Sequence, residues 1–316
     1  MESIGAVILT AGLGKRLRPL TELLPKPMLP IVGKPLIDII LEKLIKNGAT
    51  RVHCNLFHQK EKLSRHLSSR GFPVMLHVEE ELLGTGGGIG GMKSELIRYE
   101  AILIHNGDIL SNFDYTDATT LHKRRKALMT MILLKEGPPA NVLCRENGTI
   151  AGIHGKSPEK KGIWLGYTGM AILSNEALKY FPDSKRADLV DIINKMIETE
   201  PERVIYWRAD ETDTKSPLWV DIGTLKGYLK IHEMIILEKA KFHPSLPPPP
   251  LPFHICEGAE IDPGARWEGF LEVQRGARIK GDTFLKNCIV MEGTTVEKGT
   301  VAEESIIAGE KTIKVE

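Results

Sequence analysis

Residues 6–21 read Ala-Val-Ile-Leu-Thr-Ala-Gly-Leu-Gly-Lys-Arg-Leu-Arg-Pro-Leu-Thr, and Pro25-Lys26-Pro27 follows a few residues later. The apolar run 6–9 is typical of a buried strand. It ends in a turn that contains Gly12 and Gly14, where the small residues let backbone N–H groups come close to a ligand. Because cationic side chains follow at once, the stretch predicts a loop that holds a polyphosphate.

The cations of this loop decide between a plain turn and a phosphate site, and they are Lys15, Arg16, Arg18 and Lys26. A lone G-x-G is more often a turn beside solvated charges. A Walker A loop would need Ser or Thr after Gly14-Lys15, where this chain has Arg16. A dinucleotide fingerprint would need a third glycine where Leu17 stands. The loop is therefore a phosphate loop of another kind.

The stretch resembles the signature of the sugar-phosphate nucleotidylyltransferases, G-x-G-x-R-L-x-P-L-T followed by P-K-P. The fixed positions are met by Gly12, Gly14, Arg16, Leu17, Pro19, Leu20, Thr21, Pro25, Lys26 and Pro27. The resemblance covers roughly residues 4–238 and is strongest to the mannose-1-phosphate guanylyltransferase and N-acetylmuramate-1-phosphate uridylyltransferase types. It implies a Mg²⁺-dependent enzyme whose substrates are an NTP and a sugar 1-phosphate.

The resemblance also implies roles for single residues. Arg16 is expected to stabilise the leaving β- and γ-phosphates, and Lys26 to contact the α-phosphate and the sugar phosphate. The expected nucleotide contacts come from the loop and from a second glycine-rich stretch, and they are Leu9, Ala11, Gly12, Gly14, Lys15, Gly84, Thr85 and Gly86.

Two aspartates are the expected Mg²⁺ ligands. Asp108 follows the apolar run 101–105 and is also expected to be catalytic, and Asp221 lies in a match to the family's W-x-D-x-G-T. Either aspartate alone would more often be a turn or helix-cap residue. Two carboxylates together with a cationic loop favour a metal–phosphate site, because Mg²⁺ suits one or two carboxylates and substrate phosphates.

The sugar side of the site is less clearly marked. Lys156 is expected to correspond to the lysine of the family's E-K-P, although Gly155 stands where the family has glutamate. Gly169 lies in Tyr167-Thr168-Gly169-Met170, which resembles the segment that closes over the sugar. The identity of the sugar therefore stays open.

The composition limits the classes of protein to which the chain can belong. The 316 residues predict about two domains, and the net charge of +1 provides no field that would recruit nucleic acid or a membrane. No apolar stretch approaches the ~20 residues of a membrane span, and the first residues lack the basic region of a signal peptide. The four cysteines lack C-x-x-C spacing, which is typical of reduced thiols in a cytoplasmic protein rather than of disulfides or zinc. The histidines form no H-x-x-x-H pair, so a histidine metal site gains little support.

Strand and helix patterns alternate through the first third of the chain. Strands are expected at 6–9, 51–57, 73–78 and 101–105, separated by helices at 35–46 and 59–69 and by a glycine turn at 84–88 that leads into helix. The middle third adds a hairpin at Asn147-Gly148 and a long helix that Thr224 caps. The pattern predicts an α/β fold with a Rossmann-like mixed, mostly parallel sheet flanked by helices.

A change of periodicity marks a second domain. We predict a catalytic domain at 1–241 and a proline-rich linker at 242–254. Beyond it, apolar residues recur every six positions, at Ile255, Ile261, Trp267, Val273, Ile279 and Leu285. This spacing is typical of a parallel β-helix and resembles hexapeptide-repeat left-handed β-helices, so residues 255–316 are expected to form about three coils whose open end favours homo-oligomers.

The chemistry needs no protein nucleophile, because a sugar 1-phosphate is largely dianionic at neutral pH, its second pKa being about 6. The protein has to align two anions and neutralise charge. GTP with mannose 1-phosphate is the first expectation, and UTP or dTTP with another sugar 1-phosphate is the alternative. A hexapeptide acyltransferase, for which His254 is the one histidine of the repeat region, and an inactive regulatory subunit are the competing classes.

Overall fold

The computed structural model describes residues 3–153, 161–211, 217–237 and 252–315. The contacts within the chain define two units. Unit 1 comprises Met1–Leu13 and Ile40–Trp219, and unit 2 comprises Gly14–Ile39 and Val220–Glu316. Most of the predicted linker lies outside the described residues, so the predicted boundaries stay a prediction. No helix in the described part of the chain is long and apolar enough to cross a membrane.

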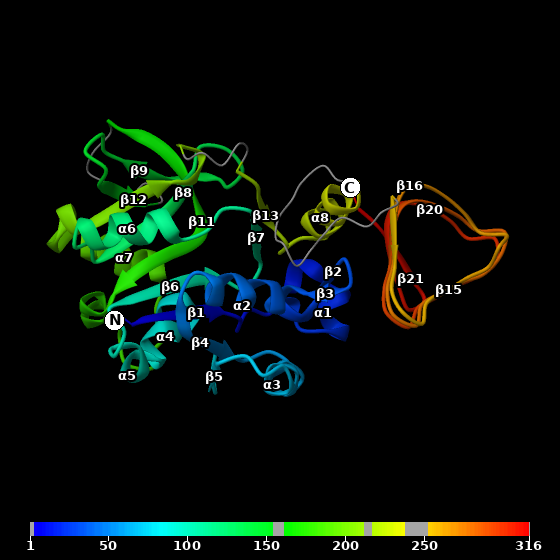
Figure 1. The fold of residues 1–316 in the computed structure, drawn as a ribbon, viewed down its shortest axis with the longest axis horizontal. Helices are drawn as coiled ribbons and strands as arrows, with labels where there is room; N and C mark the ends of the chain where they lie inside the picture. The colour runs from blue at the N-terminus through cyan, green and yellow to red at the C-terminus, as the bar shows by residue number, and fades with distance from the viewer. Residues whose placement is uncertain (1–2, 154–160, 212–216, 238–251, 316) are drawn as a thin grey trace. The chain divides into compact units, whose positions relative to one another are not determined.

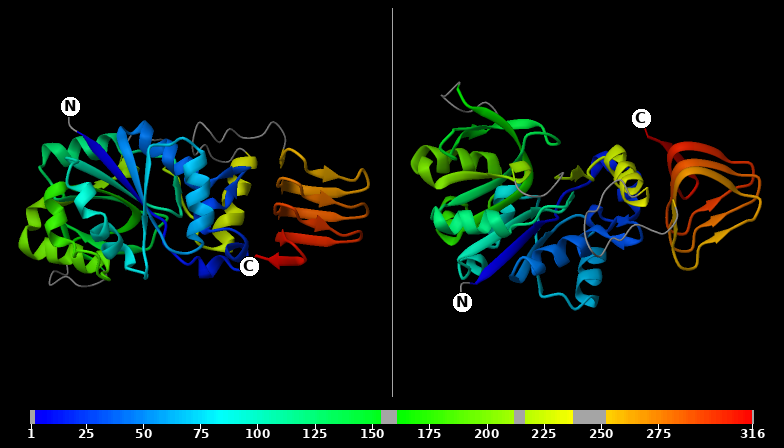
Figure 2. Two further views of the ribbon diagram at one scale, coloured as in Figure 1. Left: turned by 90° about the horizontal axis from the view of Figure 1, so that it is seen from below. Right: turned by 45° about the horizontal axis from the view of Figure 1, so that its top comes forward.

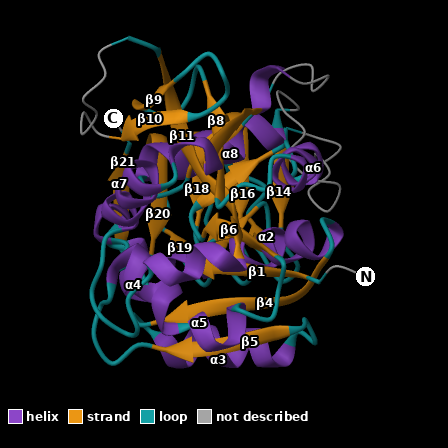
Figure 3. Cartoon of the chain, turned by 90° about the vertical axis from the view of Figure 1, so that its left-hand side faces the viewer, coloured by secondary structure: helices purple, strands orange, loops and turns teal. Residues whose placement is uncertain are grey.

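The centre of unit 1 is a nine-stranded sheet built around the predicted first strand (Figure 1). β1 (Ile4–Leu9) is parallel both to β4 (Ala49–Leu56) and to β6 (Ala101–Asn106), and β4 is parallel to β5 (Val74–Val78). Figure 3 shows β1, β4 and β5 side by side. Because parallel strands end at one edge of a sheet, the loops after β1 and β6 emerge together.

The remaining strands make the sheet mixed, as predicted. β11 (Ile163–Ser174) is antiparallel to β6, to β8 (Met129–Leu134) and to β9 (Ala140–Cys144). The predicted hairpin at Asn147-Gly148 joins β9 to β10 (Ile150–Ile153), and β12 (Val204–Arg208) pairs in parallel with β8. The short strands β7 (Ile109–Ser111) and β13 (Trp219–Asp221) pair with each other in a separate sheet.

Seven α-helices follow β3 along the described chain. They are α2 (Leu36–Lys46), α3 (Lys60–Ser69), α4 (Gly84–Gly91), α5 (Lys93–Leu96), α6 (Thr116–Arg124), α7 (Leu189–Thr199) and α8 (Leu225–Ile236). The predicted glycine turn at 84–88 is wrong, because α4 already begins at Gly84. After β11 the chain forms a 3-10 helix, Asn175–Tyr180.

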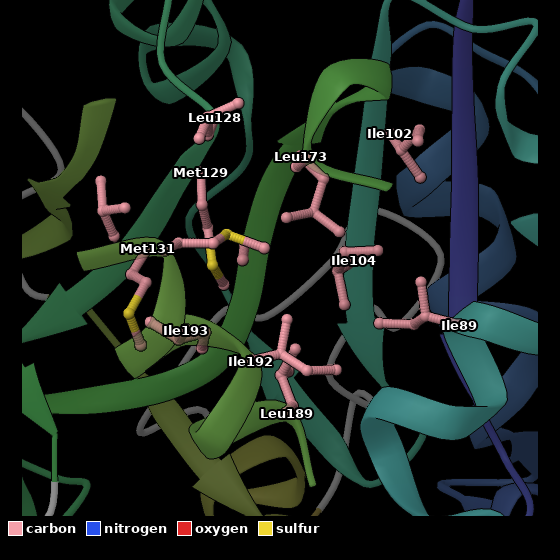
Figure 4. Close-up of a cluster of buried hydrophobic side chains, with 14 of the residues drawn as sticks. Ile89, Ile102, Ile104, Leu128, Met129, Met131, Leu173, Leu189, Ile192 and Ile193 are labelled. Atoms are coloured by element: carbon pink, nitrogen blue, oxygen red, sulfur yellow. The ribbon is translucent and has the colours of Figure 1, made fainter. Parts of the chain in front are cut away.

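The core of unit 1 lies where α4 and α7 cover the sheet. Ile89 of α4 and Ile192 and Ile193 of α7 pack with Ile104 of β6 and Leu173 of β11, and all five are buried (Figure 4). This apolar layer fixes both helices close to the edge of the sheet where the loops after β1 and β6 emerge.

Unit 2 begins with the second half of the signature loop. Its elements are the 3-10 turn Lys15–Leu17, α1 (Leu20–Leu23), the 3-10 turn Lys26–Met28 and the hairpin of β2 (Pro30–Ile31) and β3 (Lys34–Pro35). Thr224 caps α8 by accepting a hydrogen bond from the Gly227 N–H, as predicted. The Tyr228 hydroxyl of α8 donates to the Pro30 carbonyl oxygen over 2.7 Å, which ties α8 to β2.

The C-terminal part of unit 2 is a stack of parallel strands (Figure 2). One ladder runs β14 (Phe253–Ile255), β16 (Arg266–Val273), β18 (Phe284–Val290) and β20 (Val301–Ala308), and β21 (Lys311–Lys314) closes it in antiparallel pairing. A second ladder runs β15 (Glu260–Ile261), β17 (Arg278–Ile279) and β19 (Thr295–Val296). Successive strands of one ladder thus come from successive turns of the chain.

The register of this stack accounts for the six-residue spacing and its interruption. Arg266 pairs with Phe284, whereas Leu271 pairs with Cys288, so the offset between paired residues is shorter at the second pair. The change of offset falls between Glu268 and Leu271, where the repeat is disturbed. The apolar residues expected in the core at Val273, Ile279 and Leu285 are buried there. Ile255 is 40% exposed instead, and it lies in β14, the first strand of the ladder among the described residues.

Candidate active site

The loop after β1 is fixed by buried polar groups of the neighbouring strands. The Thr10 N–H donates to the Asn55 side-chain oxygen over 2.8 Å, and the Thr10 hydroxyl donates to the Asn55 carbonyl oxygen. Asn55 in turn donates to Glu79 over 2.7 Å. Ala11 is buried, whereas Gly12 is exposed, and a Cβ placed on Gly12 would have no heavy atom within 4 Å. The backbone at Gly12 is therefore open to a ligand.

Gly14 is a glycine for a steric and a conformational reason. Its φ of +60° lies in the left-handed region, and a Cβ there would stand 2.7 Å from the Thr21 Cγ2. The Thr21 hydroxyl donates to the Gly14 carbonyl oxygen over 2.9 Å. This turn starts the 3-10 helix that exposes the side chains of Lys15 and Arg16.

Three predicted side chains of unit 2 converge on Gly223. A Cβ placed on Gly223 would lie 2.6 Å from the Asp221 Oδ1, 2.8 Å from the Arg16 Nη2 and 2.9 Å from the Lys26 Nζ. The Asp221 Oδ1 accepts the Gly223 N–H over 2.6 Å, and the Arg16 Nη2 lies 3.6 Å from the Asp221 Oδ2. Gly223 was not among the predicted site residues, although its place in W-x-D-x-G-T marked it.

The predicted aspartate of unit 1 stands beside the start of the loop. Gly107 donates its N–H to the Leu9 carbonyl oxygen over 3.0 Å, and a Cβ on Gly107 would lie 2.7 Å from that oxygen. Asp108 follows directly and is half-buried. The close approach of β1 and β6 at Gly107 thus brings Asp108 to the end of β1.

The predicted sugar-side glycine packs against the same strand end. Gly169 has a φ of +78°, and a Cβ there would lie 2.7 Å from the Asn106 side-chain nitrogen. Gly169 therefore borders Asn106, the last residue of β6. Lys156, the other predicted sugar-side residue, lies outside the described residues.

The second glycine-rich stretch forms the start of α4. The N–H groups of Gly86 and Gly87 both donate to the Ala187 carbonyl oxygen, over 3.1 and 3.2 Å. The Thr85 hydroxyl oxygen accepts the Leu189 N–H over 3.2 Å. The first turn of α4 is thus bonded to the chain just before α7, and the N–H of Gly86 already has a partner within the protein.

A small cavity of about 100 Å³ lies in unit 1 between these segments. Thr85, Asn106, Asn141, Tyr167 and Asp188 line it together with apolar residues. The Tyr167 hydroxyl is buried, and among the described residues it has no hydrogen-bond partner. Burial raises the pKa of Tyr167, so its hydroxyl stays protonated and can donate to a ligand. Tyr167 lies within a predicted sugar-side motif, but it was not among the predicted site residues.

A second cavity, of about 290 Å³, is bordered by Gly88 and Gly91 of α4. Glu79, Glu80 and Glu81 line it together with Asn55 and Gly88. A Cβ on Gly88 would lie 2.7 Å from the Asn55 side-chain nitrogen and 3.0 Å from a Glu79 oxygen. The glycine therefore makes room for the buried Thr10–Asn55–Glu79 chain that holds the loop after β1.

The comparisons with known proteins agree with this architecture. A family model described as nucleotidyl transferase matches residues 5–237. The mannose-1-phosphate guanylyltransferase of Mycobacterium tuberculosis is 27% identical over 305 residues, which is 93% of this chain and 81% of that protein. The UTP–glucose-1-phosphate uridylyltransferase of Synechocystis is 26% identical, over 92% of this chain and 81% of that protein. The crystal structure of HddC from Yersinia pseudotuberculosis shares the fold, with a TM-score of 0.58 and 22% identity over 74% of this chain and 99% of that one.

Proposed function

The chain belongs to the nucleotidyl transferase family, and from that premise we propose that it transfers a nucleoside monophosphate from an NTP to a sugar 1-phosphate. An oxygen of the sugar phosphate forms a bond to the α-phosphorus, and the bond from that phosphorus to the β-phosphate oxygen breaks. The products are an NDP-sugar and pyrophosphate. No protein nucleophile and no general base are needed, because the attacking phosphate is already anionic.

One observation carries the proposal, namely the meeting of Arg16, Lys26 and Asp221 around Gly223. The two cations and the carboxylate lie close together beside a glycine, and each is exposed or half-buried. Such a group suits a polyphosphate and its counter-ion. In this proposal Arg16 holds the β- and γ-phosphates, and Lys26 holds the α-phosphate and the incoming phosphate. Both cations stabilise negative charge that grows as the pyrophosphate leaves.

We propose Asp108 and Asp221 as the ligands of a Mg²⁺ ion. The donor set fits, because Mg²⁺ prefers carboxylate oxygens supplemented by water and substrate phosphates. Asp221 already accepts a hydrogen bond from Gly223 and faces Arg16, which fixes its carboxylate in place. When bound, the ion would neutralise charge on the phosphates and orient them.

For the sugar side we propose the cavity lined by Asn106, Asn141 and Tyr167, with Gly169 packed against Asn106. Amide groups and a protonated phenol match the hydroxyl groups of a sugar, which both donate and accept hydrogen bonds. GTP with mannose 1-phosphate is our first substrate pair, and it is supported by the guanylyltransferase relative. UTP or dTTP with another sugar 1-phosphate is the alternative, favoured by the uridylyltransferase relative.

We further propose that residues 255–316 form a left-handed β-helix of hexapeptide repeats. The parallel ladders support this, because each residue pairs with a partner about three hexapeptides further along the chain, which is the length of one turn. Its open end would serve self-association. The protein is proposed to work in the cytoplasm, where its cysteines stay reduced, and each of the four is a free thiol in the structure.

The test of the activity is pyrophosphate release with a panel of GTP, UTP, dTTP, CTP and ATP, each with its matching sugar 1-phosphates and Mg²⁺. Arg16→Ala and Asp108→Asn should each lower kcat/KM by at least ~10², because each removes charge stabilisation from the transition state. Two control variants, Arg51→Ala in β4 and Asp117→Asn in α6, remove the same kinds of charge as the site variants, but from exposed positions elsewhere. They should leave kcat/KM unchanged.

The outcomes separate the rival functions. Full activity of both site variants would overturn the site assignment. If the wild-type chain released no pyrophosphate with any pair, a non-catalytic subunit would be favoured. Acetyl transfer from acyl-CoA to a sugar nucleotide would favour the acyltransferase.

A further inference from the structure

Three metal-ligating side chains that the proposed active site does not use meet in unit 2. They are His254 of β14, Cys256 just after β14, and Glu272 of β16, and their ligand atoms all lie within 4.8 Å of one another. In the part of the chain that the structure describes, no other group of three His, Cys, Asp or Glu residues is as closely gathered.

The parallel register of the stack creates this group. His254 is the pairing partner of Glu272 on the next turn, so their side chains lie next to each other on the same face of the ladder. Cys256 follows His254 with a single residue between them. The spacing H-x-C resembles no common zinc motif, and the third residue depends on the offset between turns, so sequence spacing alone did not reveal the group.

The two distances from the His254 Nδ1 are close to those of a tetrahedral zinc site. The His254 Nδ1 lies 2.9 Å from the Glu272 Oε2 and 3.8 Å from the Cys256 Sγ. Zinc bonds of about 2.0–2.1 Å to nitrogen and oxygen and about 2.3 Å to sulfur place nitrogen and oxygen roughly 3.3 Å apart, and nitrogen and sulfur roughly 3.6 Å apart. Shifts of a few tenths of an ångström would therefore bring the nitrogen into place with both partners.

Burial of the carboxylate gives a second, independent indication. The Glu272 side chain is fully buried, and its Oε1 has no hydrogen-bond partner among the described residues. An unpaired buried carboxylate oxygen is costly, and a cation is the usual compensation. The nearby His232 cannot supply it, because its Nδ1 is bonded to the Tyr228 carbonyl oxygen and its Nε2 accepts the Val32 N–H.

The turn between β2 and β3 covers the group. A Cβ on Gly33 would lie 2.9 Å from the His254 Cε1 and 3.2 Å from the Cys256 Sγ, so only glycine leaves these side chains their space. The His254 side chain is 28% exposed, which leaves a path for an ion.

We propose that His254, Cys256 and Glu272 bind one Zn²⁺ ion, with a fourth position for water. The mixed nitrogen, sulfur and oxygen donors favour zinc over Mg²⁺, which takes oxygen ligands. The ion would link β14 to β16 beneath the β2–β3 turn. It would thereby anchor the first turn of the stack, the one whose Ile255 is exposed, to the rest of unit 2.

The alternative is a buried ion pair with a proton in place of the metal. Hydrogen bonds with Cys256 and Glu272 raise the pKa of His254 to about 10, so without metal the imidazole is charged at neutral pH. Zinc would have to displace that proton. The ion pair and the metal site can be separated by direct titration.

The experiment uses the full chain, reduced and freed of metal with a chelator. Zn²⁺ is titrated in competition with a chromophoric chelator, and Co²⁺ is then used as a spectroscopic substitute. We expect one tight equivalent of Zn²⁺, a thiolate-to-cobalt charge-transfer band, and a higher melting temperature with zinc. The band identifies Cys256, because the other three cysteines are buried.

Variants make the assignment specific. Cys256→Ser and Glu272→Gln should each weaken zinc binding at least about 10-fold and remove the gain in melting temperature. Cys288→Ser, in a buried position of β18, is the matched control and should bind zinc as the wild type does. Circular dichroism checks that each variant is folded. If a variant does not fold, the cobalt spectrum of the wild-type protein still tests whether Cys256 binds the metal. Absence of the charge-transfer band, or equal zinc affinity in a folded Cys256→Ser variant, would overturn the proposal in favour of the ion pair.

Discussion

Gly169 shows how one position combines backbone strain with crowding. Its left-handed φ alone would cost an alanine roughly 1–2 kcal/mol, and its Cβ would also lie 2.7 Å from the Asn106 side chain. We therefore expect Gly169→Ala to lower the free energy of unfolding by more than that and to raise KM for the sugar phosphate, because Asn106 lines the proposed sugar cavity. Urea unfolding and steady-state kinetics measure both effects.

A matched control separates strain from crowding at this position. Gly276 has a similar φ of +65°, but a Cβ there would meet nothing within 4 Å. Gly276→Ala should therefore lower the free energy of unfolding only by the conformational cost of the left-handed φ. The additional loss in Gly169→Ala should shrink in an Asn106→Ala background, and an unchanged loss there would show that Asn106 is not the cause.

Single residues also mark the limit of sequence reasoning about the site. Arg16, Lys26 and Asp221 were singled out because they match a family motif, and their meeting at Gly223 depends on contacts between segments that lie far apart in the sequence. Tyr167 could be identified only from the structure. Its hydroxyl is buried and has no hydrogen-bond partner among the described residues, and this distinguishes it from an ordinary strand tyrosine. The group around Glu272 depends on the offset between turns of the stack.

At the scale of elements, the sequence of α4 explains why this helix was predicted as a turn. Its sequence, Gly-Thr-Gly-Gly-Gly-Ile-Gly-Gly, argues against a helix by propensity. The structure requires these glycines, because a Cβ on Gly87 would lie 2.3 Å from the Lys185 carbonyl oxygen and one on Gly90 would lie 2.0 Å from that of Pro182. The strands were predicted well for the opposite reason, since buried apolar runs such as β1 and β6 leave little choice of structure.

This explanation of α4 can be tested with two neighbouring substitutions. Gly90→Ala should destabilise the protein and displace α4, because the new methyl group would collide with the Pro182 carbonyl oxygen. Gly91→Ala should stabilise it by about 0.5–1 kcal/mol, since Gly91 is exposed and its nearest neighbour, the Leu83 Cδ1, would be 3.7 Å away. Equal effects of the two substitutions on the urea midpoint would show that propensity, and not packing, governs the helix.

At the scale of the whole molecule, buried neutral histidines set how stability depends on pH. His53, His105 and His122 of unit 1 are almost fully buried. Burial lowers the pKa of His53 and of His122 to about 4, and burial together with Lys43 lowers that of His105 to about 3. In the unfolded chain each histidine binds a proton near pH 6.5, so between pH 6.5 and about 4 the unfolded state binds more protons than the folded state. Stability must therefore fall as the pH drops through this window.

Replacing one of these histidines tests the linkage. The His122 Nδ1 lies 2.8 Å from the Thr130 hydroxyl, and a glutamine at this position can keep a hydrogen bond to it without titrating. Urea unfolding from pH 8 to pH 5 should show a constant difference between wild type and His122→Gln above about pH 7, where histidine is neutral in both states. Below pH 6.5 the free energy of unfolding of the variant should rise relative to that of the wild type, by about 1–2 kcal/mol at pH 5. Parallel curves over the whole range would mean that His122 takes up its proton in the folded protein as readily as in the unfolded chain.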